Sequence, residues 1–509
     1  MIPTDRNSRI ARCLIAAAGI AWLIAGRAAA APLPADHVDD FAGRPRLVVL
    51  SDIGNEPDDQ MSFVRLMLYS NEIDLEGLIA TTSTWLRTTT NPQTMREIED
   101  AYGKVRPNLL RNARGWPTAA ALKALTKSGQ IGFGMAATGE GKDSEGARQL
   151  IAAADRADPR PLWVSVWGGA NTLAQALIDM RATRTPEEVA KFVAKLRVYT
   201  ISDQDDAGLW IRKEFPDLFY IVSPSPQGGD DYSAATWTGI SGDILDHSML
   251  GADTSIVNDK WLDANIRKGP LGKHYPHVAY IMEGDTPSFL GLIGNGLDSW
   301  RNPSWGGWGG RYFYRAPKGE KHSVWTQGGD MFSRVTSQDE VTGSDGRSYL
   351  SDQATIWRWR EAYQHDFAAR MDWTMKPYRE ANHNPLVVLN AKAGSDPLVI
   401  DAVVGQPVTL DAAGTRDPDR QAVTYHWFHY AEAGAGTGVG LAAVKIEGDD
   451  APKATVTPTA LCNPVWSLEH SSCPAIGVAH IILAVTDSGT PSLTSYRRVI
   501  LTVHGSQPK

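Results

Sequence analysis

Four carboxylic acids occupy eight consecutive positions in the stretch LVVLSDIGNEPDDQMSF, where an apolar run gives way to an amphipathic one: Asp52, Glu56, Asp58 and Asp59. Pro57 suits the first turn of a helix, and acids in that turn are favoured by the helix dipole. Helix capping accounts for one or two of these acids but not for Asp52, which directly follows the apolar run. Carboxylates that converge at such a corner repel one another unless a cation neutralises them.

Two later apolar runs also end in acids: TISDQDDAG contains Asp203, Asp205 and Asp206, and YIMEGDTPS contains Glu283 and Asp285. Between them, VWGGANT supplies a glycine-rich turn followed by Asn171, which we expect to contact a substrate. Oxygen ligands without sulfur or clustered imidazole suit a hard cation. Mixed and flexible oxygen ligation favours Ca²⁺ over Mg²⁺, so the sequence predicts a calcium site.

The elements that must position these acids alternate between strand-like and helix-like runs. Alternation of this kind predicts an α/β domain with a mostly parallel, doubly wound sheet, whose ligands bind beyond the carboxyl ends of the strands. The expected strands are 46–50, 75–82, 161–167, 196–202 and 277–283, and the expected helices include 58–70, 171–180 and 355–373.

Past Pro377 the sequence changes to short β-branched runs broken by Gly, Pro and Asp, as in DAAGTRDPD and TYHWFHY. This texture predicts an all-β, immunoglobulin-like sandwich. The predicted division of the chain is a signal peptide at 1–30, a linker at 31–44, the α/β domain at 45–376, a linker at 377–390 and the sandwich at 391–509.

The N-terminus reads as an export signal, with three arginines, an apolar stretch and a small-residue cleavage site at 28–30. An uncleaved anchor is the alternative to cleavage. We expect a secreted protein, periplasmic or extracellular, with no membrane segment after cleavage. In that compartment Cys462 and Cys473, the two cysteines that follow the signal, predict a disulfide; two unpaired thiols are the alternative. The net charge of −8 argues against a nucleic-acid partner.

The motifs SDIGNEPDD, LEGLIATTSTW, MEGDTPSFL and WGGWGGRY together resemble a known family. The first two are similar to the start of the nucleoside hydrolases. SDIGNEPDD, MEGDTPSFL and WGGWGGRY resemble, more closely, the nucleoside-hydrolase-like family of exported proteins labelled cellulose-binding, in which a C-terminal sandwich is usual. The resemblance spans roughly residues 45 to 375 and implies a nucleoside-hydrolase-like fold.

Residue by residue, the resemblance implies that Asp52, Asp59 and Asp285 ligate Ca²⁺ together with the backbone carbonyl of Trp167. It implies that Asp58 activates the attacking water and contacts sugar hydroxyls. The sequence departs from the nucleoside hydrolases in several places. The loop from Asp52 to Asp58 is two residues longer, and Gly284 stands where many of them have a histidine. These departures argue against nucleoside hydrolysis.

The glycine-rich segment DSWRNPSWGGWGGRYFY contains Trp305 and Trp308, which we expect to form a partly exposed platform for sugar rings. Packing against the sheet is the alternative for each ring, because large aromatic side chains are mostly buried. The sequence therefore favours a Ca²⁺-dependent hydrolase acting on a glycan or glycoside. The alternatives are a non-catalytic, cellulose-type binding protein with a structural Ca²⁺ and, less favoured, nucleoside salvage. The sequence predicts no particular oligomeric state.

Overall fold

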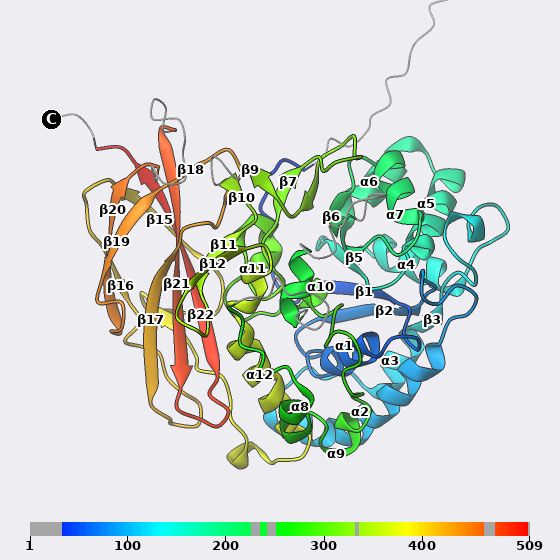
Figure 1. Ribbon diagram of the computed structural model, residues 1–509, viewed down its shortest axis with the longest axis horizontal. Helices are drawn as coiled ribbons and strands as arrows, with labels where there is room; N and C mark the ends of the chain where they lie inside the picture. Colours follow the sequence, from blue (N-terminus) through cyan, green and yellow to red (C-terminus); the bar gives the residue numbers. More distant parts are fainter. Residues whose placement is uncertain (1–32, 225–234, 242–250, 331–334, 463–473, 507–509) are drawn as a thin grey trace, which may run out of the picture.

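The computed structural model describes residues 33–224, 235–241, 251–330, 335–462 and 474–506. An α/β domain and a β-sandwich lie side by side, and Figure 1 shows the sandwich strands in orange and red beside the blue-to-green α/β domain. Among the described residues, no helix is both long and apolar enough to cross a membrane. The predicted signal peptide lies outside the described residues and stays a prediction.

The α/β domain is built on an eight-stranded sheet that is parallel except at one edge, where the last two strands pair antiparallel. In spatial order the strands are β3 (Thr126–Ser128), β2 (Asp74–Ala80), β1 (Arg46–Ser51), β4 (Leu162–Val166), β5 (Leu196–Ser202), β6 (Phe219–Ser223), β8 (Val324–Thr326) and β7 (Phe313–Arg315). The predicted parallel α/β sheet is thus confirmed. The strand order reverses between β1 and β4, and such a switch point is where open parallel sheets bind ligands.

Helices cover both faces of this sheet because β1 is apolar on both sides. Leu47 and Val49 face one core, with helices α1 (Pro57–Met67), α2 (Pro92–Asn112) and α12 (Arg360–Trp373). Val48 and Leu50 face the other core, with α4 (Glu145–Asp155), α5 (Asn171–Thr183), α6 (Pro186–Lys195) and α7 (Ala207–Glu214). The shorter helices are α3 (Ala119–Leu125), α8 (Asp259–Asn265), α9 (Gly269–Gly272), α10 (Pro287–Leu290) and α11 (Ala354–Trp357).

Two sequence-based boundaries need correction. Residues 277–283, expected to form a strand, are irregular: Ala279 and Tyr280 are exposed, and Glu283 has a left-handed backbone (φ +57°), which no strand can accommodate. The single helix expected at 355–373 is two helices, α11 and α12, which are separated at Arg358 and Trp359. Trp357 and Trp359 are buried, in agreement with a packing role.

The C-terminal domain is the predicted sandwich, and its two sheets enclose a core that includes Trp427, Ile481 and Leu501. One sheet has the order β15 (Leu398–Val403), β22 (Thr494–His504), β21 (Ile476–Asp487) and β17 (Val423–Tyr430), with β18 (Gly440–Leu441) beside β21. The other has the order β16 (Val408–Asp411), β20 (Lys453–Ala460) and β19 (Ala443–Glu447).

Three small two-stranded antiparallel sheets lie outside these larger sheets. They pair β9 (Gly329–Asp330) with β10 (Val335–Thr336), β11 (Asp339–Thr342) with β12 (Ser348–Ser351) and β13 (Val388–Leu389) with β14 (Lys392–Ala393).

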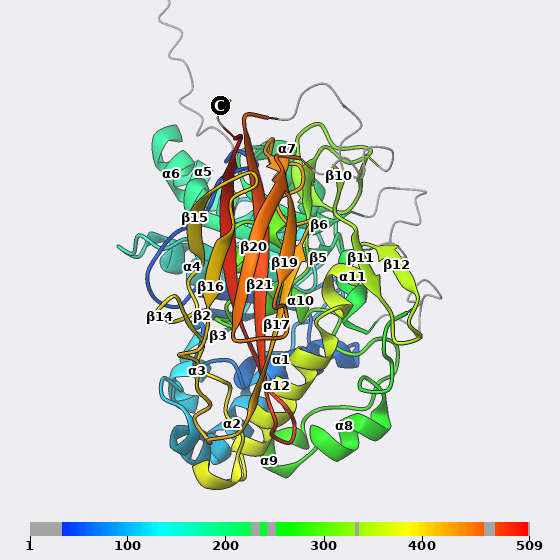
Figure 2. The same ribbon diagram turned by 90° about the vertical axis from the view of Figure 1, so that its left-hand side faces the viewer.

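The two domains share a buried seam. Figure 2 shows the sandwich in front of the α/β domain, and Figure 1 shows β21 and β22 nearer to that domain than β16, β19 and β20. In the seam, the Trp359 ring lies 5.9 Å from the Tyr430 ring and 5.4 Å from the Tyr496 ring of the sandwich. One continuous hydrophobic core includes residues of both domains. The sandwich therefore packs tightly on the larger domain.

The predicted disulfide is only partly within the described residues. Cys462 is disulfide-bonded. Cys473 lies outside the described residues, so the pairing of these two cysteines stays a prediction.

Candidate metal and catalytic site

The acidic corner lies at the switch point of the sheet. Asp52 directly follows β1, and Trp167 directly follows β4, the neighbouring strand. Gly168 comes so close to Asp52 that a Cβ at this position would lie 2.5 Å from Asp52 Oδ1. The carboxyl ends of two parallel strands therefore meet at Asp52, where the topology places a ligand site.

The second side of the site is the first turn of α1. Pro57 occupies the first turn as predicted, and Glu56 is the N-cap residue, although its side chain makes no capping hydrogen bond. Asp58 and Asp59 follow in that turn, where the helix dipole favours negative charge. Asp59 is buried and accepts a hydrogen bond from the Ser51 hydroxyl, whereas Asp58 stays partly exposed.

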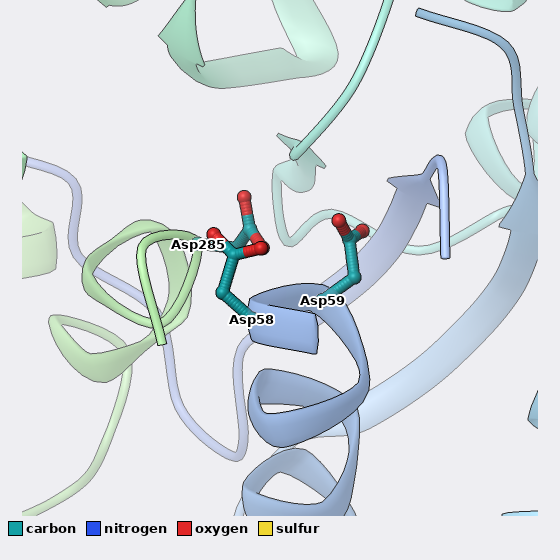
Figure 3. A group of neighbouring side chains, drawn as sticks. All are labelled: Asp58, Asp59 and Asp285. Atoms are coloured by element: carbon teal, nitrogen blue, oxygen red, sulfur yellow. The ribbon is translucent and has the colours of Figure 1, made fainter. Parts of the chain in front are cut away.

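Asp285 completes the site from a distant loop. One oxygen of Asp58, one of Asp59 and one of Asp285 lie within 4.8 Å of one another. Figure 3 shows Asp58 and Asp59 on the first turn of α1 and Asp285 beside Asp58. Gly284, which directly precedes Asp285, must lack a side chain. A Cβ at this position would lie 2.7 Å from Asp58 Oδ2 and 3.1 Å from the ring of Trp237.

A buried ion pair holds the Asp285 loop against α1. The Arg65 Nε atom lies 2.5 Å from Glu283 Oε2, and both side chains are fully buried. Tyr275 donates a 2.6 Å hydrogen bond to the other Glu283 oxygen. This pair fixes Glu283 in its left-handed conformation, two residues before Asp285. Glu283 therefore positions the loop rather than joining the carboxylates, which sequence reasoning did not anticipate.

The carboxyl groups of the site lie buried beside one another, which opposes their ionisation. Burial is the main cause that raises the pKa of Asp52, Asp59 and Asp285. For Asp59 and Asp285, the charges of the neighbouring carboxylates add to this effect, and the pKa lies well above the ordinary value. Burial, followed by the charges of Glu56 and Asp52, raises the pKa of Asp58 to about 7. Four carboxyl groups that each resist ionisation need either protons or a cation.

The donor set fits a hard divalent cation. Within the described part of the chain, Asp52 Oδ1 and Asp285 Oδ2 are buried without a hydrogen-bond partner, which is unfavourable unless another group satisfies them. The Trp167 carbonyl accepts a 2.6 Å hydrogen bond from Gln204 Nε2 and keeps a second lone pair. The Trp167 indole points elsewhere, because its Nε1 donates to the hydroxyls of Ser165 and Ser288. An all-oxygen set of this kind suits Ca²⁺.

Asn171 lies next to the site but is held by the protein. It is fully buried at the start of α5, and its side-chain nitrogen donates to Thr82 Oγ1 at 3.0 Å and to the Gly132 carbonyl at 2.8 Å. Its backbone N–H donates to Asp205 Oδ2, and Asp205 also accepts from the Ala207 N–H. Asp205 thus caps two neighbouring loops rather than extending the carboxylate group.

Two further acids from the same strand end also have structural partners. Asp203 forms an ion pair with Arg212 at 2.8 Å, and Asp206 accepts a hydrogen bond from the Met135 N–H. Their sequence pattern matched that of the metal corner, yet each side chain bonds to a neighbouring loop or helix. Acid content at a strand end alone therefore does not identify a metal ligand.

The expected aromatic platform is wrong. Trp305 and Trp308 are 8% and 1% exposed, because the sandwich covers them. The Trp305 ring lies 5.4 Å from the His480 ring, and the Trp308 ring lies 6.5 Å from the Tyr496 ring. Both partners belong to the C-terminal domain, and no local pattern around the tryptophans reveals a surface supplied from so far along the chain.

Comparison with known proteins places the chain in a family. Residues 46–312, more than half of the chain, match the model of the cellulose-binding Sde182, nucleoside hydrolase-like domain. The chain belongs to the Sde182 family. Residues 407–503 match the model of the C-terminal domain of the cellulose-binding protein Sde0182. The predicted resemblance is thereby confirmed, and no curated protein matches the chain.

A solved structure supports the same fold. A nucleoside hydrolase-related hypothetical protein from Saccharophagus degradans, described as associated with carbohydrate metabolism, is 36% identical with a TM-score of 0.73. The match covers 91% of this chain and 100% of that one. The effector protein XOO4466 is 11% identical over 56% of this chain and 88% of that one, with a TM-score of 0.28. A likeness that weak carries no argument, so the Sde182 assignment depends on the first match and the family models.

Proposed function

We propose that this member of the Sde182 family is an exported, Ca²⁺-dependent hydrolase of glycosidic bonds in a glycan or glycoside. The observation that carries the proposal is the group formed by Asp58, Asp59 and Asp285, whose oxygens lie within 4.8 Å of one another at the switch point of the sheet. The family's cellulose-binding description supports a carbohydrate ligand. Export follows from the predicted signal peptide.

Asp52, Asp59, Asp285 and the Trp167 carbonyl would hold the Ca²⁺. When bound, Ca²⁺ supplies positive charge that offsets the buried carboxylates and makes a nearby water more acidic. Asp58 is the partly exposed acid of the group, so its carboxylate can meet both water and substrate. It accepts the proton of the attacking water while the water oxygen bonds to the anomeric carbon. The electron pair of the broken glycosidic bond leaves with the oxygen of the departing group, which takes a proton from solvent water.

A first experiment tests the metal and the base separately. Calorimetry should detect Ca²⁺ uptake by the wild-type protein and lose it in Asp285→Asn. With a panel of oligosaccharides and aryl glycosides, Asp58→Ala should lower turnover by about 100-fold or more. Asp401→Asn is the control, because this acid is exposed on the sandwich. Undiminished turnover by Asp58→Ala would refute the catalytic assignment.

The second candidate is a non-catalytic polysaccharide-binding protein with a structural Ca²⁺, which the cellulose-binding description of the family favours. Under this alternative, the protein sediments with insoluble cellulose but releases no reducing ends, and Asp58→Ala binds as the wild type does. Measurement of reducing ends over the whole glycan panel distinguishes the two candidates.

A further inference from the structure

Trp85 differs from every other tryptophan in the described ranges. It is 60% exposed, whereas the others are buried or half-buried. Burial of a large aromatic ring is favourable, so a protein that leaves one indole in solvent while burying the rest forgoes that contribution at this position. Trp85 therefore calls for an explanation other than packing.

The turn that presents Trp85 is rigid. The Ser83 hydroxyl accepts hydrogen bonds from the backbone N–H groups of Trp85 (3.0 Å) and Leu86 (3.2 Å). The Ser83 N–H donates to the Leu86 carbonyl at 3.0 Å, and the Thr84 N–H donates to the Gln204 carbonyl at 2.7 Å. These bonds fix the backbone on both sides of Trp85, so the point from which the indole projects is held in place before any ligand arrives.

The base of this turn contacts the carboxylate site at two points. The buried Ser83 side chain lies beside Asp52. Gln204, which accepts from Thr84, donates through its side chain to the Trp167 carbonyl. The exposed ring thus stands at the rim of the site that holds Asp52 and Trp167.

We propose that Trp85 stacks on the apolar face of a pyranose ring in a β-linked glucan chain bound at the carboxylate site. This inference depends on the proposed function in taking a carbohydrate as the ligand of that site. The C–H face of a β-linked glucose unit is flat and apolar, and its hydroxyl groups project sideways. A ring stacked on the indole can direct those hydroxyls toward the adjacent acids.

The surroundings of Trp85 fit a chain longer than one sugar. The Arg87 guanidinium lies 4.5 Å above the Phe133 ring, which joins the Trp85 loop to the loop after β3. Phe133 also lines a cavity of about 720 Å³ whose walls carry charged groups such as Lys142 and Arg148. That volume lies within the usual range for small-molecule sites, and the lining combines apolar surface with charged side chains that can bind hydroxyl groups.

The test measures cellopentaose binding by calorimetry in the presence of Ca²⁺. Trp85→Ala should weaken binding about fivefold, which corresponds to the about 1 kcal/mol that an aromatic contact of this kind contributes. Trp85→Phe should keep most of the affinity, since it retains a flat ring. Tyr378→Ala is the matched control, because Tyr378 is an exposed aromatic residue stacked on His383 in the segment that joins the domains.

A second readout uses the exposure of the indole. Cellopentaose should protect part of the tryptophan fluorescence of the wild type from acrylamide quenching. Trp85→Phe should lose that protected component while it still binds. Unchanged affinity in Trp85→Ala would overturn the inference, and so would a failure of the wild type to bind cellopentaose at millimolar concentration.

Asp58→Ala separates this inference from the proposed function. When it binds cellopentaose, Asp58→Ala should still show the Trp85-dependent protection from acrylamide quenching, because Trp85 is intact. If Asp58→Ala also hydrolyses glycans normally, the proposed function fails while the stacking role of Trp85 stands. If Trp85→Ala binds normally but Asp58→Ala is inactive, only the stacking role fails.

Discussion

Two fully buried aspartates, Asp285 at the carboxylate corner and Asp339 at the domain seam, have opposite electrostatic settings. Asp339 accepts hydrogen bonds from Arg311 Nε at 2.7 Å, Arg358 Nη1 at 2.8 Å and the Tyr430 hydroxyl at 2.6 Å. Although burial alone would raise the pKa of Asp339, the two arginines hold it below the ordinary value. Asp285 faces Asp58 and Asp59 instead, and burial together with those charges raises its pKa well above the ordinary value.

The difference lies in the counter-charge and not in the burial. At the seam, the chain supplies its own cations, so the charge serves to join the sandwich to the larger domain. At the corner, the nearest charged neighbours are acids. Several acids buried together lower the stability of a folded protein. Such groups, with strongly shifted pKa values, are found most often at functional sites.

The largest effect should come from removing the carboxylate at the seam. Asp339→Asn leaves Arg311 and Arg358 buried without their anion, which should lower the free energy of unfolding by about 3–5 kcal/mol. Urea denaturation measures the loss. Asp345→Asn is the control, because Asp345 also pairs with an arginine, Arg347, but on the surface, where little change is expected. Equal effects from the two variants would contradict the structural role of the seam.

The second effect is the response of the corner to metal. At a free Ca²⁺ concentration 100 times Kd, the wild type should gain about 2.7 kcal/mol of stability, because the folded state alone presents the assembled site. Thermal unfolding with and without Ca²⁺ measures the gain, with Mg²⁺ as the comparison ion. Asp285→Asn should lose most of it. A calcium effect that persists in Asp285→Asn would place the ion elsewhere.

The sequence predicted which carboxylates meet at the corner but not which aromatic rings the seam buries, and the reason is physical. Asp52, Asp58 and Asp59 lie within eight residues at a strand-to-helix junction, so local pattern and strand polarity suffice to bring them together. Trp305 and Trp308 depend on contacts with strands near residues 480 and 496, and no local signal predicts which loops a second domain covers.

The positioning groups of the site were missed for a related reason. Arg65 and Glu283 are more than two hundred residues apart, and their pairing emerges only when α1 packs against the Asp285 loop. Asp285 itself could be placed from the sequence only through the resemblance to the family, because residues 277–283, the strand expected before it, are irregular. Trp85 stood in the quoted motif LEGLIATTSTW, but exposure cannot be read from a local pattern.

The third effect is the pH dependence that His480, a histidine at the seam, gives to the free energy of unfolding. His480 is buried, with Arg498 Nη1 2.9 Å from its Nδ1, and burial, Arg498 and His429 together hold its pKa well below the ordinary value. Below about pH 6.5 the unfolded chain therefore protonates this histidine while the folded protein does not. Its contribution to stability is complete above that pH and is lost as the pH falls, by up to about 1.4 kcal/mol per unit.

The measurement compares the free energy of unfolding of the wild type and His480→Asn between pH 7.5 and 5. Asparagine can still accept the hydrogen bond of Arg498 but does not titrate, so the gap between the two proteins should narrow by about 2 kcal/mol as the pH falls. His322→Asn, which removes an exposed histidine, should show no such change with pH. A constant gap for His480→Asn would refute the prediction.

The smallest effect tests the contrast between Asp285 and Asp339 most directly. The change in stability caused by Asp285→Asn should have opposite signs without and with Ca²⁺. In Ca²⁺-free buffer, Asp285→Asn removes one of the mutually repelling buried acids and should stabilise the protein by about 1 kcal/mol at neutral pH. With saturating Ca²⁺, the same variant should be less stable than the wild type, because it lacks a ligand. Denaturation of both proteins in chelator and in Ca²⁺ measures the crossover. If Asp285→Asn were destabilising in both buffers, as Asp339→Asn should be, Asp285 would be a structural acid like its counterpart at the seam, and the corner would have no demonstrated need for a cation.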